Sequence, residues 1–453
     1  MGISNIVFIV ILAAASFFFY KQVSRIRRNI LLGRDEQIND QKGERWKTMA
    51  RVALGQSKMV VRPVAGLMHI FVYLGFIIIN IEVLEIILDG IFGTHRLFHQ
   101  ALGDFYYFII NTFEVLALLV VIGVLVFLAR RLVLRVERFW KPEMKGWPTK
   151  DALYILYIEL ILMGAFLFMN AADSVLMTTD SALLAEAGLA KYDLQLAGNF
   201  WISGWLTGIL PQDLNTLAMI ERGAWWAHIV GILLFLNYLP ISKHFHIILA
   251  FPNTWYSNLK NKGQFSNLDA VTKEVKLMMD PNADPFAAAP EGGEAEGEAE
   301  IPSFGAKDVT DLSWKSLMDA YTCTECGRCT SNCPANITGK KLSPRKIMMD
   351  TRDRVEEFGK GIDKNGKDFS DGKSLLGDYI SEEELWACTT CNACTESCPV
   401  NIDPLRIIVD LRRSLVMEAS SMPSELTSMV NNIQNNAAPW AFSQADRANW
   451  INE

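Results

Sequence analysis

Apolar residues crowd the first 250 positions, where they form five long windows separated by polar and basic segments. Each window is long enough to cross the roughly 30 Å of hydrocarbon in a bilayer as an α-helix. The pattern therefore predicts five membrane-spanning helices. The windows cover residues 3–20, 64–88, 105–128, 152–177 and 224–239.

The charges between the windows predict the topology. Residues 21–62 carry 11 Lys and Arg and residues 129–151 carry seven, whereas residues 89–104 carry one and residues 178–222 carry two. Basic loops remain in the cytoplasm. We therefore expect a multi-pass protein of the inner (cytoplasmic) membrane, with its N-terminus outside and everything after about residue 240 in the cytoplasm.

The first window is expected to stay in the mature chain. A signal peptide begins with basic residues, but here the basic cluster follows the apolar run, and no small-residue cleavage site is apparent. The next segment, residues 30–61, is amphipathic and basic. Two interpretations are open for it: a helix on the inner membrane surface, or a solvated linker.

Composition argues against a wholly soluble protein. Half of the 453 residues are apolar and 21% are charged, below the roughly 25% of soluble domains. The excess of 50 acidic over 43 basic residues comes largely from residues 291–300, where five of ten are Glu. Net charge therefore gives no argument for nucleic acid. Residues 281–305 cannot bury a core, so we expect a flexible tether there, with an acidic docking site as the alternative.

All eight cysteines lie after residue 320, in two copies of one motif. Each copy reads C-x2-C-x2-C-x3-C-P, the signature of bacterial ferredoxins with two [4Fe–4S] clusters. Three cysteines of one copy and the fourth of the other hold each cluster. The predicted ligands are Cys323, Cys326, Cys329 and Cys398 for cluster 1, and Cys388, Cys391, Cys394 and Cys333 for cluster 2.

The alternatives to clusters are weak. Zinc sites use C-x2-C pairs and need neither a third spaced cysteine nor a proline. Disulfides do not suit a cytoplasmic domain, where thiols stay reduced. The sequence that follows the fourth cysteine is also similar in the two copies, and each copy leads into a predicted helix.

The six histidines lie between residues 69 and 246, and ionisable residues in a bilayer point to function. His69 and His246 are expected at the inner depth, and His228 at the outer depth with His95 and His99. A bis-His b haem needs one imidazole on each face, from facing helices. The depths predict an inner haem on His69 and His246 and an outer haem on His228 and His99.

Two conditions apply to this assignment. His228 and His246 share one helix face only if the fifth helix continues past Pro240. For His95 and His244 we expect hydrogen-bonded side chains rather than ligands.

The run from His228 to Pro240, with His246 after it, resembles the fifth helix of the nitrate reductase gamma subunit and of the related cytochrome b of heterodisulfide reductase, its E subunit. The resemblance implies that His228 and His246 bind different haems and that His69 is the inner ligand of the second helix. The outer histidine of that helix is missing, because Ile79 and Asn80 stand near its place. One or two b haems are therefore implied, with His99 or His95 as the replacement ligand.

The cysteine motifs and the run Ile-Asp-Pro-Leu-Arg-Ile-Ile at 402–408 resemble the C subunit of heterodisulfide reductase and the dicluster modules of succinate dehydrogenase-like and glycolate oxidase-like proteins. In larger fused relatives, a segment similar to the tail leads into a cysteine-rich CCG domain. The resemblance implies a partner with a CCG domain, similar to the B subunit of heterodisulfide reductase, or a flavoprotein catalytic subunit.

The expected fold is mainly α, a five-helix transmembrane bundle followed by a cytoplasmic α-helical dicluster ferredoxin domain. Six parts are predicted: an N-terminal transmembrane helix (1–30), a cytoplasmic amphipathic segment (31–61), a cytochrome b-like bundle (62–250), an acidic flexible linker (251–305), a dicluster [4Fe–4S] domain (306–415) and a C-terminal docking tail (416–453).

The expected function is that of an oxidoreductase subunit that passes electrons between a cytoplasmic catalytic partner and membrane quinone. No Rossmann, Walker or nucleophile motif is apparent, so the organic substrate is expected on another chain and no catalytic residue is assigned. Two alternatives are a haem-free membrane anchor for a ferredoxin and a redox-driven ion-pump subunit. Charged residues inside the windows would favour the pump, but they are few (Glu82, Glu85, Glu114 and Glu159). Glu82 and Glu85 could form a proton path or bind quinone, or they could equally be solvated at the outer end.

Overall fold

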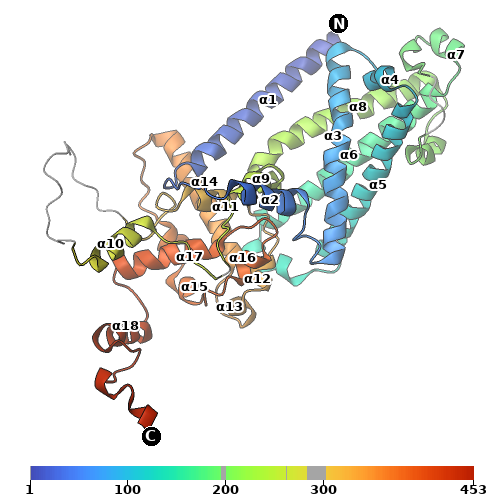
Figure 1. The fold of residues 1–453 in the computed structure, drawn as a ribbon. Coiled ribbons are helices and arrows are strands. Elements are labelled where there is room, and N and C mark those ends of the chain that lie inside the picture. Colours follow the sequence, from blue (N-terminus) through green and yellow to red (C-terminus); the bar gives the residue numbers. More distant parts are fainter. Residues whose placement is uncertain (1, 195–199, 262, 283–302, 453) are drawn as a thin grey trace.

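The computed structural model describes residues 2–194, 200–261, 263–282 and 303–452. Within these residues the chain forms helices and turns, and its strand-like pairing is limited to two isolated bridges. Figure 1 shows a bundle of long helices with a globule of short helices at one end. The mainly α prediction is confirmed.

Five helices are long and apolar enough to cross a membrane, and each contains one of the predicted windows. Apolar side chains on their outer faces are exposed, as lipid contact requires. Each helix extends beyond its window at one end or at both. The helices are α1 (Ile3–Ile30), α3 (Pro63–Phe92), α5 (Phe105–Leu132), α6 (Trp147–Met177) and α8 (Leu214–Tyr238).

Within the bundle, α6 packs on α8 and α3 packs on α5. Two glycines allow these close approaches. A Cβ atom at Gly75 would lie 2.3 Å from Cγ2 of Val120, and one at Gly231 would lie 2.7 Å from Cδ2 of Leu162. Small residues at such crossings let helix backbones come together.

The fifth helix does not continue to His246, which corrects the expectation of one shared helix face. It ends at Tyr238, and two 3₁₀ turns follow, Leu239–Ile241 and Lys243–Phe245. Proline lacks an N–H group and interrupts the helical ladder. A separate helix, α9 (His246–Trp255), then begins at the histidine itself.

The globule contains both cysteine motifs. Its core joins α14, α17 and the start of α11 through fully buried side chains such as Leu317, Ile347 and Leu411. The same core includes Ile26 of α1 and Phe245, so bundle and globule share one apolar interior. The helices are α11 (Trp314–Thr322), α12 (Arg328–Ser331), α13 (Pro334–Ile337), α14 (Pro344–Asn365), α15 (Glu382–Trp386), α16 (Ala393–Ser397) and α17 (Pro404–Arg413).

The segment after α1 is fastened to the globule, so it is not a free solvated linker. Arg34 exchanges backbone hydrogen bonds with Leu312 (2.8 Å) and Trp314 (3.1 Å). In α2 (Lys42–Met49), the buried Arg45 guanidinium donates to the carbonyls of Trp255 (3.1 Å) and Ser257 (3.0 Å). A π-helical turn, Ala50–Leu54, leads from α2 towards α3.

The predicted linker, 251–305, is partly ordered. Its first residues belong to α9, where Asn253 and Thr254 are buried, and a further helix, α10 (Asp269–Met279), follows. Residues 283–302, with the Glu-rich run, lie outside the described residues. The tail forms α18 (Ser424–Asn436), which has no buried residue and projects from the globule (Figure 1).

Candidate functional site

Four cysteines from both motifs line one small cavity. They are the three closely spaced cysteines of the first motif, Cys323, Cys326 and Cys329, together with Cys398 of the second. The loop at the start of α12 turns through two residues in the left-handed region, Glu325 (φ +53°) and Gly327 (φ +70°). This tight turn points three thiols towards one space, and Cys398 closes it.

The remaining cysteines gather on the second loop. The thiol of Cys388 lies within electrostatic range of Cys333 and Cys391, and Cys394 within range of Cys388. The turn repeats the first one, with left-handed residues at Thr390 (φ +56°) and Asn392 (φ +60°). Cys391 is exposed, whereas no cysteine of the first loop is.

Both groups fit [4Fe–4S] clusters. All eight cysteines are free thiols, as cluster ligands must be before loading. Across the described residues, no three His, Cys, Asp or Glu side chains converge as ligands of a single metal ion. A cluster spreads its four thiolates over the corners of a cube, whereas zinc would draw them together.

At the inner end of the bundle, His69, His244 and His246 come together. Nδ1 of His246 is 3.0 Å from the carbonyl oxygen of Lys243. The rings of His244 and His246 are perpendicular, with centroids 5.5 Å apart. His69 is near enough to feel the charge of His246, and its shielded Nδ1 has no hydrogen-bond partner.

His244 is a member of this group that sequence reasoning set aside. Its Nε2 lies 3.6 Å from Oε1 of Glu159. Burial, reinforced by His246 and His69, lowers the pKa of His244 to about 3, and burial also lowers the pKa of His246. Neutral imidazoles are the form that binds iron. The available signal was the His-x-His spacing directly after Pro240.

His228 stands alone on α8. Its Nδ1 is 2.9 Å from the carbonyl oxygen of Leu162, while its buried Nε2 has no partner. A ring held through one nitrogen and open at the other is the usual form of an imidazole ligand. His228 is 14 residues past Leu214, about 21 Å along α8, which begins ten residues before its apolar window.

The other two histidines lie at the opposite end of the bundle. Nε2 of His95 is 2.9 Å from Oδ1 of Asp173, which agrees with the expectation of a hydrogen-bonded side chain. His99 is in α4 (Leu97–Leu102), where its ring packs on Tyr106. In the described part of the chain, no hydrogen bond or ring contact joins His99 to His228.

A buried polar network that the sequence did not predict surrounds this end. Arg96 donates to Glu82 (2.8 Å), Asp173 (2.8 Å) and Asn170 (2.6 Å). Glu85 accepts from Tyr106 (2.6 Å). Glu82 and Glu85 are each 1% exposed, so the alternative that they are solvated is wrong. No sequence pattern marks Arg96, because it lies in a loop outside the windows.

The first cysteine loop lies against the inner histidines. Arg328 donates to the carbonyls of Lys58 (2.7 Å) and Met59 (3.3 Å), and its charge reaches His69. Glu325 forms an ion pair with Lys243. Burial opposes the charge of Glu325, but Lys243 and Arg352 keep the pKa of its carboxyl below the usual value.

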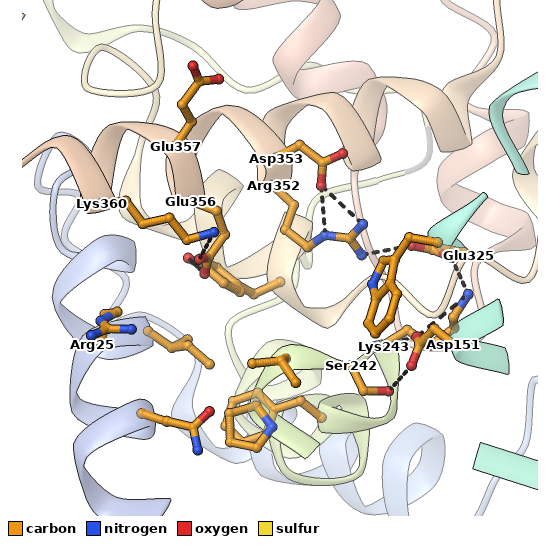
Figure 2. A pocket seen from close by; sticks show the side chains of 17 residues that line it. Arg25, Asp151, Ser242, Lys243, Glu325, Arg352, Asp353, Glu356, Glu357 and Lys360 are labelled. Atoms are coloured by element: carbon orange, nitrogen blue, oxygen red, sulfur yellow. Dashed lines mark hydrogen bonds and ion pairs between the residues drawn. The ribbon is translucent and has the colours of Figure 1, made fainter. Parts of the chain in front are cut away.

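A cavity of about 410 Å³ opens beside this ion pair, between α1, the start of α6, the turns after Pro240 and α14. Figure 2 shows Lys243 between Asp151 and Glu325, with Arg352 on the far side of Glu325. Nη1 of Arg352 is 2.9 Å from Oε1 of Glu325. The seam between bundle and globule is therefore a chain of alternating charges.

Comparison with known proteins agrees with the cysteine site. The family described as 4Fe-4S dicluster domain matches residues 322–402. The C subunit of the ferredoxin/F(420)H(2)-dependent CoB-CoM heterodisulfide reductase of Methanosarcina acetivorans is 34% identical over 107 residues, 23% of this chain and 52% of that protein. The globule is thus a dicluster [4Fe–4S] ferredoxin domain with relatives among heterodisulfide reductase C subunits, and the chain is a membrane protein that carries it.

Two relatives align with nearly the whole chain. The probable iron-sulfur-binding oxidoreductase FadF of Bacillus subtilis is 27% identical over 478 residues, 99% of this chain and 61% of that protein. The EtfAB:quinone oxidoreductase of Syntrophomonas wolfei is 27% identical over 473 residues, 99% of this chain and 59% of that protein. The chain spans about three fifths of the length of both. No solved structure matches it.

Proposed function

We propose that this chain is the membrane subunit of a respiratory-type oxidoreductase, and that it passes electrons between a cytoplasmic catalytic partner and membrane quinone through two [4Fe–4S] clusters and one or two b haems. When bound, these groups supply one-electron transfer. The polypeptide itself holds the clusters and haems in sequence and keeps these sites inside the protein.

One observation carries the proposal: the cysteine loop of cluster 1 and the inner histidines share one seam. Arg328, two residues after Cys326, acts on His69, and Glu325, directly before Cys326, pairs with Lys243 three residues before His246. A ferredoxin that was merely anchored needs no such contact between its ligand loop and buried imidazoles.

The residues present suit haem at the inner site. His69 and His246 would hold it, and His244 is a third candidate beside them. His228 would hold a second haem, with its Nδ1 fixed by Leu162 and its Nε2 open. His99 remains the proposed partner of His228.

The cysteines of cluster 1 and cluster 2 are assigned as the sequence predicts, and their grouping on the two loops supports this. The exposure of Cys391 supports a position for cluster 2 at the protein surface, where a partner could reach it. The exposed apolar residues of the tail, Trp440, Phe442 and Trp450, suit a docking role. A CCG-domain or flavoprotein subunit is the proposed partner, and the names of FadF and the EtfAB:quinone oxidoreductase agree with such chemistry.

The proposed orientation has the N-terminus outside and the ferredoxin domain in the cytoplasm. The basic segments 21–62 and 129–151 lie at the end of the bundle that contacts the globule, as Arg28 with Gly359 and Arg345 with the carbonyl of Arg138 show. The positive-inside rule assigns this end to the cytoplasm. We also propose the six-part division of the chain, with the bundle extended to residue 255 at the end of α9.

The first test is the haem b content per polypeptide, measured by pyridine haemochrome on the purified full chain in detergent. One or two haems are expected. Replacing His246 with Ala should remove one of them and leave iron–sulfur content unchanged, because His246 lies in the inner group. Replacing His95 with Gln is the matched control, because the His95 ring is hydrogen-bonded to Asp173. This variant should leave the haem and iron–sulfur contents unchanged.

The absence of haem from the wild-type chain would overturn the cytochrome proposal and leave a ferredoxin on a membrane anchor. A wild-type haem content that survives in His246→Ala would overturn the assignment of the inner ligand.

A further inference from the structure

The two cysteine loops make the same backbone turn, and at two positions the first loop carries a charged side chain where the second does not. The residue before the second cysteine is Glu325 in the first loop and Thr390 in the second, both in the left-handed region. The residue before the third cysteine is Arg328 in the first loop and Ala393 in the second. Since threonine and alanine suffice in the second loop, the turn itself requires neither glutamate nor arginine.

Both differing positions contact the bundle. Glu325 pairs with Lys243, and Arg328 donates to the carbonyls of Lys58 and Met59. In the second loop, the Thr390 hydroxyl donates to the neighbouring Thr389 carbonyl (2.8 Å). The two side chains that distinguish the first loop are therefore the ones that attach it to the membrane part.

Lys243 connects this loop to the histidine segment. Its backbone carbonyl is 3.0 Å from Nδ1 of His246, and its backbone N–H donates to Asp151 (3.1 Å). Its ammonium pairs with Glu325 and donates to the carbonyl of Pro148 (2.6 Å). One residue thus holds an imidazole with its main chain and a cysteine loop with its side chain.

The pair is poorly suited to a purely stabilising role. The side chains of Lys243 and Glu325 are 7% and 2% exposed, and desolvating two charges consumes most of what their attraction supplies. An apolar contact would join the two parts as strongly. A buried ion pair is satisfied in one register only, so it fixes how the surfaces align.

We propose that the Lys243–Glu325 ion pair positions the cluster 1 loop against the His246 segment and thereby makes cluster 1, rather than cluster 2, the electron partner of the inner haem. The two are positioning residues, which act through Cys323, Cys326 and His246. The inference rests on the proposed function. With both groups bound, each electron that leaves reduced cluster 1 would reduce one haem iron from ferric to ferrous, and no bond would be made or broken.

The sharpest variant is Glu325→Thr, because Thr390 shows that threonine suits this turn. Iron, sulfide and haem contents should equal those of wild type. Haem reduction after flash photoreduction of the clusters should be several-fold slower, because the cluster 1 loop would no longer be held against the His246 segment. Lys243→Met should behave alike, and Lys243→Arg, which keeps the charge, should recover part of the rate.

A second readout does not depend on electron flow. In Glu325→Thr, hydrogen–deuterium exchange should accelerate at residues 323–329 and 242–247 but not at residues 388–394. Glu383→Gln is the matched control, because Glu383 pairs with Lys341 (3.1 Å) on the exposed surface of the same domain. It should change neither the rate nor the exchange.

Wild-type rates and exchange in Glu325→Thr would overturn the positioning role. Failure of the proposed function is distinguishable, because it is seen as missing haem in the wild-type chain before any variant is compared.

Discussion

At the scale of single residues, the outer end of the bundle depends on one arginine. Arg96 lies in a short loop, yet its guanidinium is 4% exposed and contacts side chains from α3 and α6. The carboxylates of Glu82 and Asp173 are stable in this apolar setting only because a cation is shared between them. The Arg96 side chain thereby joins its own loop to α3 and α6.

Arg96→Met should lower the free energy of unfolding by about 3–5 kcal/mol, because it leaves two buried carboxylates without a counter-charge. The measurement is the thermal unfolding of the detergent-solubilised chain. Restoring neutrality with Glu82→Gln and Asp173→Asn in the same chain should recover part of the loss.

Lys341→Met is the control, since Lys341 and its partner Glu383 are 56% and 70% exposed; its cost should be below about 1 kcal/mol. Equal thermal midpoints for Arg96→Met and Lys341→Met would contradict the role assigned to Arg96.

At the scale of elements, the ferredoxin domain is built from two loop–helix repeats, and in the proposed ligand assignment each repeat gives its fourth cysteine to the cluster of the other. Cys333 and Cys398 each precede a proline, and Pro334 starts α13 directly. Proline suits the first turn of a helix, so the backbone leaves the cysteine loop at this point. The fourth cysteine of each motif is thereby directed towards the loop of the other motif. The repeats therefore cannot load independently.

The exchange predicts pairs of equivalent cysteine variants. Cys398→Ala should alter the same cluster as Cys326→Ala, although the two residues belong to different motifs, because both line one cavity. Cys333→Ala should match Cys391→Ala in the same way. Electron paramagnetic resonance of the reduced variants checks this, with iron content measured in parallel. A Cys398→Ala spectrum that matched Cys391→Ala instead would refute the exchange.

Much of this architecture was predictable from the sequence, and the exceptions share one physical cause. Apolar windows and cysteine spacing are local patterns, so the five helices and the ferredoxin domain followed from them directly. The pair Lys243–Glu325 and the buried position of Arg96 depend on contacts between distant segments. Nothing near Lys243 in the sequence indicates a partner 82 residues away.

At the scale of the whole molecule, the N-terminus and the ferredoxin domain lie at opposite ends of the bundle (Figure 1). Helix α1 covers this length in a single pass and ends against the globule, where Asn29 donates to Tyr321 (2.9 Å). In the proposed topology, the globule and the far end of the bundle are thereby held on opposite faces of the membrane.

This arrangement predicts the labelling pattern of two introduced cysteines. In intact cells, a membrane-impermeant maleimide should label Ser4→Cys near the N-terminus but not Ser424→Cys in the exposed α18. After lysis both should react. Labelling of Ser424→Cys in intact cells would reverse the proposed orientation.

The contact between α1 and the globule also constrains how the protein is assembled. Asn29 and Tyr321 are 292 residues apart in the chain, and Arg28 and Gly359 are 331 apart. At roughly 5–20 residues synthesised per second, α1 waits about 15–60 s for the partners of its inner end. Membrane insertion of α1 therefore precedes the closing of the seam, and the eight cysteines, at residues 323–398, are synthesised only as that interval ends or after it.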